Sequence, residues 1–143
     1  MVLADDGNYR ETRFFATWDK DRGVEEFVLP TIMHDLQKIT KFGFGLLWCN
    51  DTTIGQEICE EMWAPESPSY LMVNEGAEII SNSSGSHHTL RKLFKRLHLI
   101  KNTTSKLGGI YIYSNHQGCD GNRLYFDGCS LISMNGELYV QGS

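Results

Sequence analysis

The chain has 143 residues, of which 41% are hydrophobic, and a formal net charge of −5. This length suits one domain with its own core, and the composition excludes a disordered chain. Because no stretch approaches the roughly 20 apolar residues of a membrane span, and the N-terminus lacks a secretory apolar region, we expect a cytoplasmic protein without a membrane partner.

The first half of the chain predicts short elements. Residues 1–30 are polar and aromatic, and we expect them to be mostly loop. Residues 42–50 and 52–59 have strand character and are separated by an Asn-Asp turn signal, which predicts an antiparallel pair. After a Ser-Pro break, residues 66–76 are weakly helical, and residues 77–82 read as a compact buried strand.

The clearest predicted helix covers residues 89–107, and Gly108 and Gly109 end it. Apolar residues recur at spacings of three and four: Leu90, Leu93, Phe94, Leu97, Ile100 and Leu107. We expect the basic side chains to fall mainly on the other faces: Arg91, Lys92, Lys95, Arg96 and Lys106. Four short strands with Gly, Asp and Asn turns follow at 110–115, 123–129, 130–136 and 137–142. Strand pairs interrupted by helices indicate a layered α/β sandwich.

Charge is distributed unevenly, since residues 79–119 carry six basic side chains and no acidic one. Two interpretations are a basic helix beside acidic neighbours and a nucleic-acid patch. We favour the first, because the overall charge is acidic and no recognition motif accompanies the bases, so no nucleic-acid partner is expected. The cysteines form no C-x-x-C pair, which predicts no structural metal site and no disulfide framework: Cys49, Cys59, Cys119 and Cys129.

Cys59 is the candidate nucleophile, because it ends a predicted strand just before a chain reversal. There its thiolate could attack an amide carbonyl, form a thioester and release ammonia. Glu57, Glu60 and Glu61 surround it: one could serve as general base or act on the leaving amine, and another could hold an ammonium group. Negative neighbours disfavour a thiolate, so both roles require a cation near the sulfur. The alternative is a cysteine that only packs in the core.

The polar segment "SNSSGSHHTLRK" holds the second candidate group. Ser86 could contact a substrate carboxylate, with Arg91 or Lys92 adding charge, or it could be an ordinary helix N-cap. His87 and His88 point to different faces and cannot chelate a metal together, so we expect surface or interface histidines. The polar segment at 114–123 either lies on the same rim as Cys59 or is plain turn chemistry.

A resemblance to a known family sharpens this interpretation. The stretch "EICEEMWAPESP" resembles the cysteine motif of the nitrilase, or carbon–nitrogen hydrolase, superfamily. "LADDGNYRETRFF", "EIISNSSGSHHTLRK", "TSKLGGIYIYSNHQGCDGNRLYFDGC" and "SMNGELYVQGS" resemble the glutaminase domain of eukaryotic-type glutamine-dependent NAD synthetases. The similarity runs nearly from Met1 to Ser143 and is weakest across residues 20–55.

The resemblance implies a four-layer α-β-β-α sandwich, of which the chain 1–143 holds roughly the second half as a partial glutaminase domain. It implies that Cys59 attacks the glutamine side-chain amide and that ammonia passes through a tunnel to a separate synthetase domain. It also implies the substrate-binding residues: Tyr9, Glu60 and Trp63 in the glutamine pocket, Ser86 at the substrate's α-groups, and either Arg91 or Lys92 as the basic residue.

The departures from the family pattern carry their own expectations. The family's triad is Glu, Lys and Cys, and the matching lysine and glutamate lie upstream of Met1. The ATP loop of the synthetase domain is also absent from these 143 residues, so ATP, Mg²⁺ and deamido-NAD are not expected to bind this chain. Because the lysine and the glutamate are missing, we expect the isolated chain to be inactive. The resemblance also implies that the full-length proteins of the family form homo-oligomers. Two alternatives are a carbon–nitrogen hydrolase (amidase) acting on another small amide or nitrile, and a noncatalytic interaction module that uses Cys59 only structurally.

Overall fold

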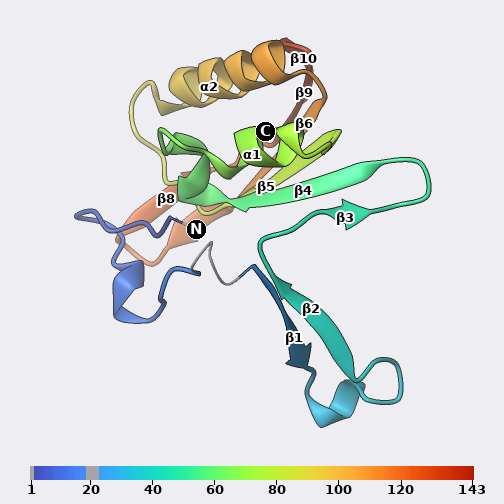
Figure 1. Cartoon of the computed structure of the whole chain (residues 1–143). Coiled ribbons are helices and arrows are strands. Elements are labelled where there is room, and N and C mark those ends of the chain that lie inside the picture. The colour runs from blue at the N-terminus through green and yellow to red at the C-terminus, as the bar shows by residue number, and fades with distance from the viewer. Residues whose placement is uncertain (1, 19–22) are drawn as a thin grey trace. The chain divides into compact units, whose positions relative to one another are not determined.

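The structure, a computed structural model, describes residues 2–18 and 23–143. Where the length alone suggested one domain, the chain forms two compact units, Met1–Gly45 and Leu46–Ser143. Figure 1 labels the two α-helices and most of the strands. Each unit contains its own β-structure. Every candidate site residue except Tyr9 lies in the second unit.

The first unit is built on an antiparallel hairpin of β1 (Val24–Val28) and β2 (Ile39–Gly43). Among the described residues of this unit there are also two short 3-10 helices, η1 (Glu11–Arg13) and η3 (Thr31–Met33). Residues 1–30 were expected to be mostly loop, and this prediction is wrong where β1 forms. Residues 19–22 lie outside the described residues.

Cross-strand contacts explain the missed strand β1. The Glu26 carboxylate pairs with the Lys41 ammonium at 3.0 Å, and the rings of Phe27 and Phe42 lie 5.8 Å apart. Such pairs stabilise a sheet even where adjacent glutamates have low strand propensity. Strand β1 therefore forms because of contacts with residues of β2, which are distant in the sequence.

The second unit contains a six-stranded sheet with the order β10-β9-β6-β5-β4-β3. The three central strands are parallel and the outer pairings are antiparallel. This confirms the predicted antiparallel pair before Cys59 and the strands predicted later in the chain. The strands are β3 (Leu47–Trp48), β4 (Thr53–Ile58), β5 (Ile79–Ser84), β6 (Ile110–Asn115), β9 (Leu131–Met134) and β10 (Glu137–Gln141).

Two α-helices, α1 (Pro68–Asn74) and α2 (Lys92–Leu107), pack on one face of this sheet (Figure 1). Met72 of α1 packs so closely that a Cβ at Gly55 of β4 would lie 2.7 Å from its sulfur. The Thr104 hydroxyl of α2 lies 3.0 Å from the Ser133 hydroxyl of β9. The helix ends at Gly108, as predicted, with φ 76. Within the described residues, no helix is long and apolar enough to cross a membrane.

A second hairpin, β7 (Gln117–Asp120) and β8 (Leu124–Asp127), follows β6. The sequence predicted β8, but it treated the segment that contains β7 as a polar turn. β7 is four residues long and mostly exposed, so it has no hydrophobic alternation that could signal a strand. Its pairing with β8 places Asp127, the last residue of β8, close to the end of α2 nearest Ser86.

The face of the sheet away from the helices carries isoleucines. The side chains of Ile58, Ile112 and Ile132 are 48%, 38% and 36% exposed. Their neighbours on the opposite, helix-covered face are buried, among them Glu57, Tyr111 and Tyr113. Parallel sheets are usually covered on both faces, which is the physical basis for the four-layer arrangement that the resemblance implies.

Candidate active site

Cys59 lies at the carboxyl end of β4, where the strand turns sharply into the 3-10 helix η4 (Cys59–Trp63). Its φ is 42, a left-handed conformation that is uncommon for a residue other than glycine. The structure therefore confirms the predicted chain reversal. The side chain is only half-buried, so the candidate nucleophile stands at the edge of the sheet rather than deep in the core.

Glu57, two residues before Cys59, is fully buried at 0% exposure. One carboxylate oxygen accepts from the Ser67 hydroxyl at 2.7 Å and the Ser69 N–H at 3.1 Å. The other accepts from the Asn82 amide at 3.4 Å and from the Tyr111 hydroxyl. Burial raises the pKa of Tyr111 well above its usual value, and the adjacent Glu57 charge adds to that rise, so Tyr111 remains a donor.

The acids around Cys59 thus have different surroundings. A carboxylate oxygen of Glu61 accepts the N–H of Ile58 at 2.8 Å and holds the start of the turn. Glu57 and Glu61 therefore bind the protein's own groups. Glu60, the third acid, is half-buried.

The parallel strands bring other polar side chains to the edge where Cys59 lies. Burial raises the pKa of Tyr113 on β6, and the Cys59 sulfur adds to that rise. The Ser84 and Ser86 hydroxyls and the Arg96 charge partly offset it. None of them meets the Tyr113 hydroxyl at ordinary hydrogen-bond geometry, so within the described residues this buried hydroxyl has no partner.

Tyr113→Phe is expected to raise the free energy of unfolding by about 1 kcal/mol, because an unpartnered buried hydroxyl costs its desolvation. Urea denaturation of both forms measures the difference. Tyr111→Phe is the matched control and should destabilise, since that hydroxyl donates to Glu57. A loss of stability in Tyr113→Phe would show that the hydroxyl is bonded.

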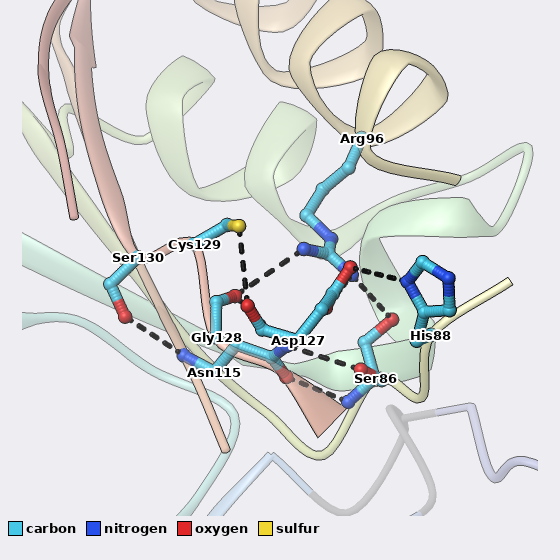
Figure 2. A network of polar contacts seen from close by, with 8 residues as sticks. All are labelled: Ser86, His88, Arg96, Asn115, Asp127, Gly128, Cys129 and Ser130. Carbon is cyan, nitrogen blue, oxygen red and sulfur yellow. Dashed lines mark hydrogen bonds and ion pairs between the residues drawn. The ribbon is translucent and has the colours of Figure 1, made fainter. Parts of the chain in front are cut away.

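Ser86 is fixed by a polar network that Figure 2 shows. Its N–H donates to Asn115 Oδ1 at 2.8 Å, and Asn115 Nδ2 donates to its carbonyl at 3.1 Å. The Ser86 hydroxyl accepts from Arg96 Nη2 at 3.3 Å. Helix α2 begins six residues later, with Arg91 at its N-cap position. The alternative that Ser86 caps the helix is therefore wrong.

Arg96 is the functional-site residue that sequence reasoning misplaced. We expected it mainly on a solvent face of the helix, but it is 0% exposed. Its guanidinium pairs with the Asp127 carboxylate at 3.2 Å and lies 5.2 Å from the centre of the Tyr113 ring. Arg96 precedes Ile100 by one helical turn, and both point toward the sheet. The four-residue spacing from Ile100 was the signal in the sequence that Arg96 faces the sheet.

The remaining predicted site residues differ in their surroundings. Lys92 and Trp63 are brought together, with the ammonium 5.9 Å from the ring centre. Arg91 is exposed and has a left-handed φ of 66. Of the two basic candidates, Lys92 is therefore the one that contacts Trp63. Tyr9 belongs to the first unit.

The two histidines also differ. His87 is 8% exposed, so the expectation of a surface or interface residue is wrong for it. It forms an antiparallel β-bridge with Phe126 of β8, and this pairing holds it against the protein. His88 is exposed, and its Nδ1 lies 3.5 Å from Asp127 Oδ2. His88 therefore borders the network around Ser86 (Figure 2).

The fold and the strand-end cysteine define a class of protein. The model of the carbon–nitrogen hydrolase family matches residues 2–143, and the chain belongs to that family. A particular group of relatives stands out within it. The chain is 53% identical to the glutamine-dependent NAD(+) synthetase of Saccharomyces cerevisiae over 99% of its own length, and 52% identical to that of Mus musculus over 100%.

These matches concern a limited part of the relatives. The chain spans 20% of the length of each of these two synthetases. Among solved structures, the glutamine-dependent NAD(+) synthetase from Cytophaga hutchinsonii superposes with a TM-score of 0.81 at 28% identity. That match covers 98% of this chain and 21% of the bacterial one. The comparison confirms a nitrilase-like α/β fold.

Proposed function

We propose that this chain is the nucleophile-bearing part of a glutaminase domain, and that it serves a glutamine-dependent NAD synthetase. The domain would release ammonia from glutamine, and a separate synthetase domain would use the ammonia to convert ATP-activated deamido-NAD to NAD. The observation that carries the proposal is Cys59 at the turn after β4, in a carbon–nitrogen hydrolase fold. The names of the most similar synthetases support the choice of substrate.

The reaction proceeds through a thioester. The Cys59 thiolate attacks the carbonyl carbon of the glutamine side-chain amide, the carbon–nitrogen bond breaks, and the nitrogen takes up a proton and leaves as ammonia. Water then hydrolyses the thioester and gives glutamate and the free thiol. The resemblance assigns the proton transfers and the stabilising cation to a glutamate and a lysine of the family's triad, and loss of one member of such a triad commonly costs several orders of magnitude in rate.

The substrate lies across the polar edge of the sheet. Ser86 contacts the α-groups of glutamine, and Glu60 and Trp63 line the pocket. Lys92, stacked over Trp63, supplies the basic group. Homo-oligomer formation, cytoplasmic location, the four-layer sandwich and the assignment of ATP, Mg²⁺ and deamido-NAD to the synthetase domain remain predictions.

The decisive experiment labels the chain with a glutamine analogue that carries a diazoketone in place of the amide. The diazo carbon takes up a proton, the Cys59 thiolate attacks that carbon, and dinitrogen leaves as a stable thioether forms, so this readout does not require turnover. We expect a single adduct on Cys59, detected by mass spectrometry of peptides and slowed by L-glutamine. Cys59→Ala should abolish the adduct.

Cys129 offers a matched control, since it is also a half-buried thiol with a left-handed φ, 58. Cys129→Ala should leave labelling unchanged. Equal labelling of Cys59 and the exposed Cys49, without protection by glutamine, would overturn the proposal. Protection by a simple amide as effective as that by glutamine would favour an amidase acting on another small amide.

A separate measurement tests the expected inactivity. Ammonia release from L-glutamine by the purified chain should be close to the uncatalysed background. Turnover at the rate of an intact glutaminase, abolished by Cys59→Ala, would contradict that expectation while supporting the assigned chemistry. The two experiments therefore separate the identity of the nucleophile from the completeness of the catalytic group.

A further inference from the structure

We propose that Arg96 is a positioning residue that fixes the direction in which the Ser86 hydroxyl donates its proton. In this arrangement Ser86 is a hydrogen-bond donor to the α-carboxylate of the bound amino acid. The proposal rests on the proposed function, because it concerns recognition of glutamine. It adds to that function a residue, Arg96, that does not itself touch the substrate.

The direction of the hydrogen bond follows from the chemistry of the guanidinium. Arg96 Nη2 lies 3.3 Å from Ser86 Oγ. A guanidinium has five N–H donors and no acceptor, so the serine oxygen must accept in this bond. The hydrogen of the Ser86 hydroxyl is thereby left for another acceptor. A carboxylate can take it, whereas an ammonium group, which only donates, cannot.

The Ser86 backbone is held equally firmly. Asn115 binds both its N–H and its carbonyl, as described above, and its amide orientation is fixed by further contacts (Figure 2). Asn115 Nδ2 also lies 3.1 Å from the Gly128 carbonyl and 3.3 Å from Asp127 Oδ1, and both are acceptors. Held at the backbone and at the hydroxyl, Ser86 has little freedom to reorient.

Arg96 acts through Ser86 rather than directly. The guanidinium is fully buried, and its charge is matched by Asp127 at 3.2 Å, so it presents no free charge to a ligand. In the part of the chain that the structure describes, the Ser86 hydroxyl has no acceptor at ordinary geometry. The nearby Tyr113 hydroxyl is likewise unpartnered. Unused buried donors at the carboxyl ends of the parallel strands are what a site for an anionic group requires.

The test compares two ligands that differ only in the α-carboxylate, L-glutamine and 4-aminobutanamide. Each ligand slows alkylation of Cys59 by iodoacetamide, and the concentration that halves the rate measures its binding. Arg96→Met should raise that concentration for L-glutamine by about tenfold or more and leave the value for 4-aminobutanamide unchanged. Ser86→Ala should do the same, and the double variant should add little. Lys95→Met, at an exposed position on the same helix, is the control.

Since Arg96→Met removes the guanidinium that pairs with Asp127, Arg96→Met with Asp127→Asn gives a second variant in which both charges of the buried pair are removed. Equal weakening of both ligands, or no change in either, overturns the role of Arg96. In both cases Cys59 would still be protected by glutamine in the parent chain, and the proposed function would stand. If L-glutamine did not protect Cys59 from alkylation in the parent chain, the proposed function itself would be contradicted.

Discussion

Glu57→Ala is expected to lower the free energy of unfolding of the second unit by at least about 3 kcal/mol. The carboxylate is 0% exposed and accepts from four donors, on Ser67, Ser69, Asn82 and Tyr111. Alanine would leave those buried donors unsatisfied and would open a cavity among them. Chemical denaturation followed by far-UV circular dichroism measures the loss.

Two comparisons make this expectation specific. Glu57→Gln keeps the volume but replaces one acceptor oxygen with a donor, so it should cost less than alanine but still about 1–2 kcal/mol. Glu75→Ala removes an exposed acid at the end of α1 and should change stability by less than about 0.5 kcal/mol. Equal effects of Glu57→Ala and Glu75→Ala would show that the buried cluster does not hold the fold together.

The buried cluster also explains why acids flank the candidate nucleophile. Glu57 joins β4 to the loop before α1 and to the neighbouring parallel strands, and it thereby fixes the strand end from which Cys59 projects. A glutamate in a strand looks like a surface residue from the sequence alone. Its burial depends on donors 10 to 54 residues away along the chain. Local pattern cannot reveal such partners.

Most of the fold followed from local signals. The 3.6-residue period of α2, its glycine stop and the short strand runs were enough to predict a layered α/β protein. The orientation of the sheet was not predictable in the same way, because the helix-covered face carries polar residues such as Asn82 and Ser133, while isoleucines line the other face. Because Ile80 is buried on the helix-covered face, hydrophobicity alone does not distinguish the two faces.

The candidate site was predictable where a residue ends an element. Cys59 and Ser86 stand after β4 and β5, and a strand end before a turn is readable in sequence. Arg96 was misplaced because basic residues on a helix usually face water, and its partner Asp127 lies 31 residues further along the chain. Ion pairs between such distant residues are set by tertiary structure.

Asp127→Ala is expected to destabilise the second unit by about 3–5 kcal/mol, because it leaves the Arg96 guanidinium buried without a counter-charge. The carboxylate also accepts from Asn115 Nδ2 at 3.3 Å, so the network around Ser86 loses a second contact. Denaturation midpoints at constant pH and salt measure the change. The same hairpin offers a control: Asp120 pairs with Arg123 at 2.7 Å, but both side chains are more than half exposed.

Asp120→Ala should cost less than about 1 kcal/mol, since an exposed pair gains little over water. Adding Arg96→Met to Asp127→Ala should restore part of the lost stability, because the orphaned charge is then removed with its partner. The restored variant should still bind L-glutamine weakly, since Ser86 has lost the donor that orients it. Recovery of stability without recovery of binding would separate the two consequences of the ion pair. Recovery of both would show that the pair serves only the fold.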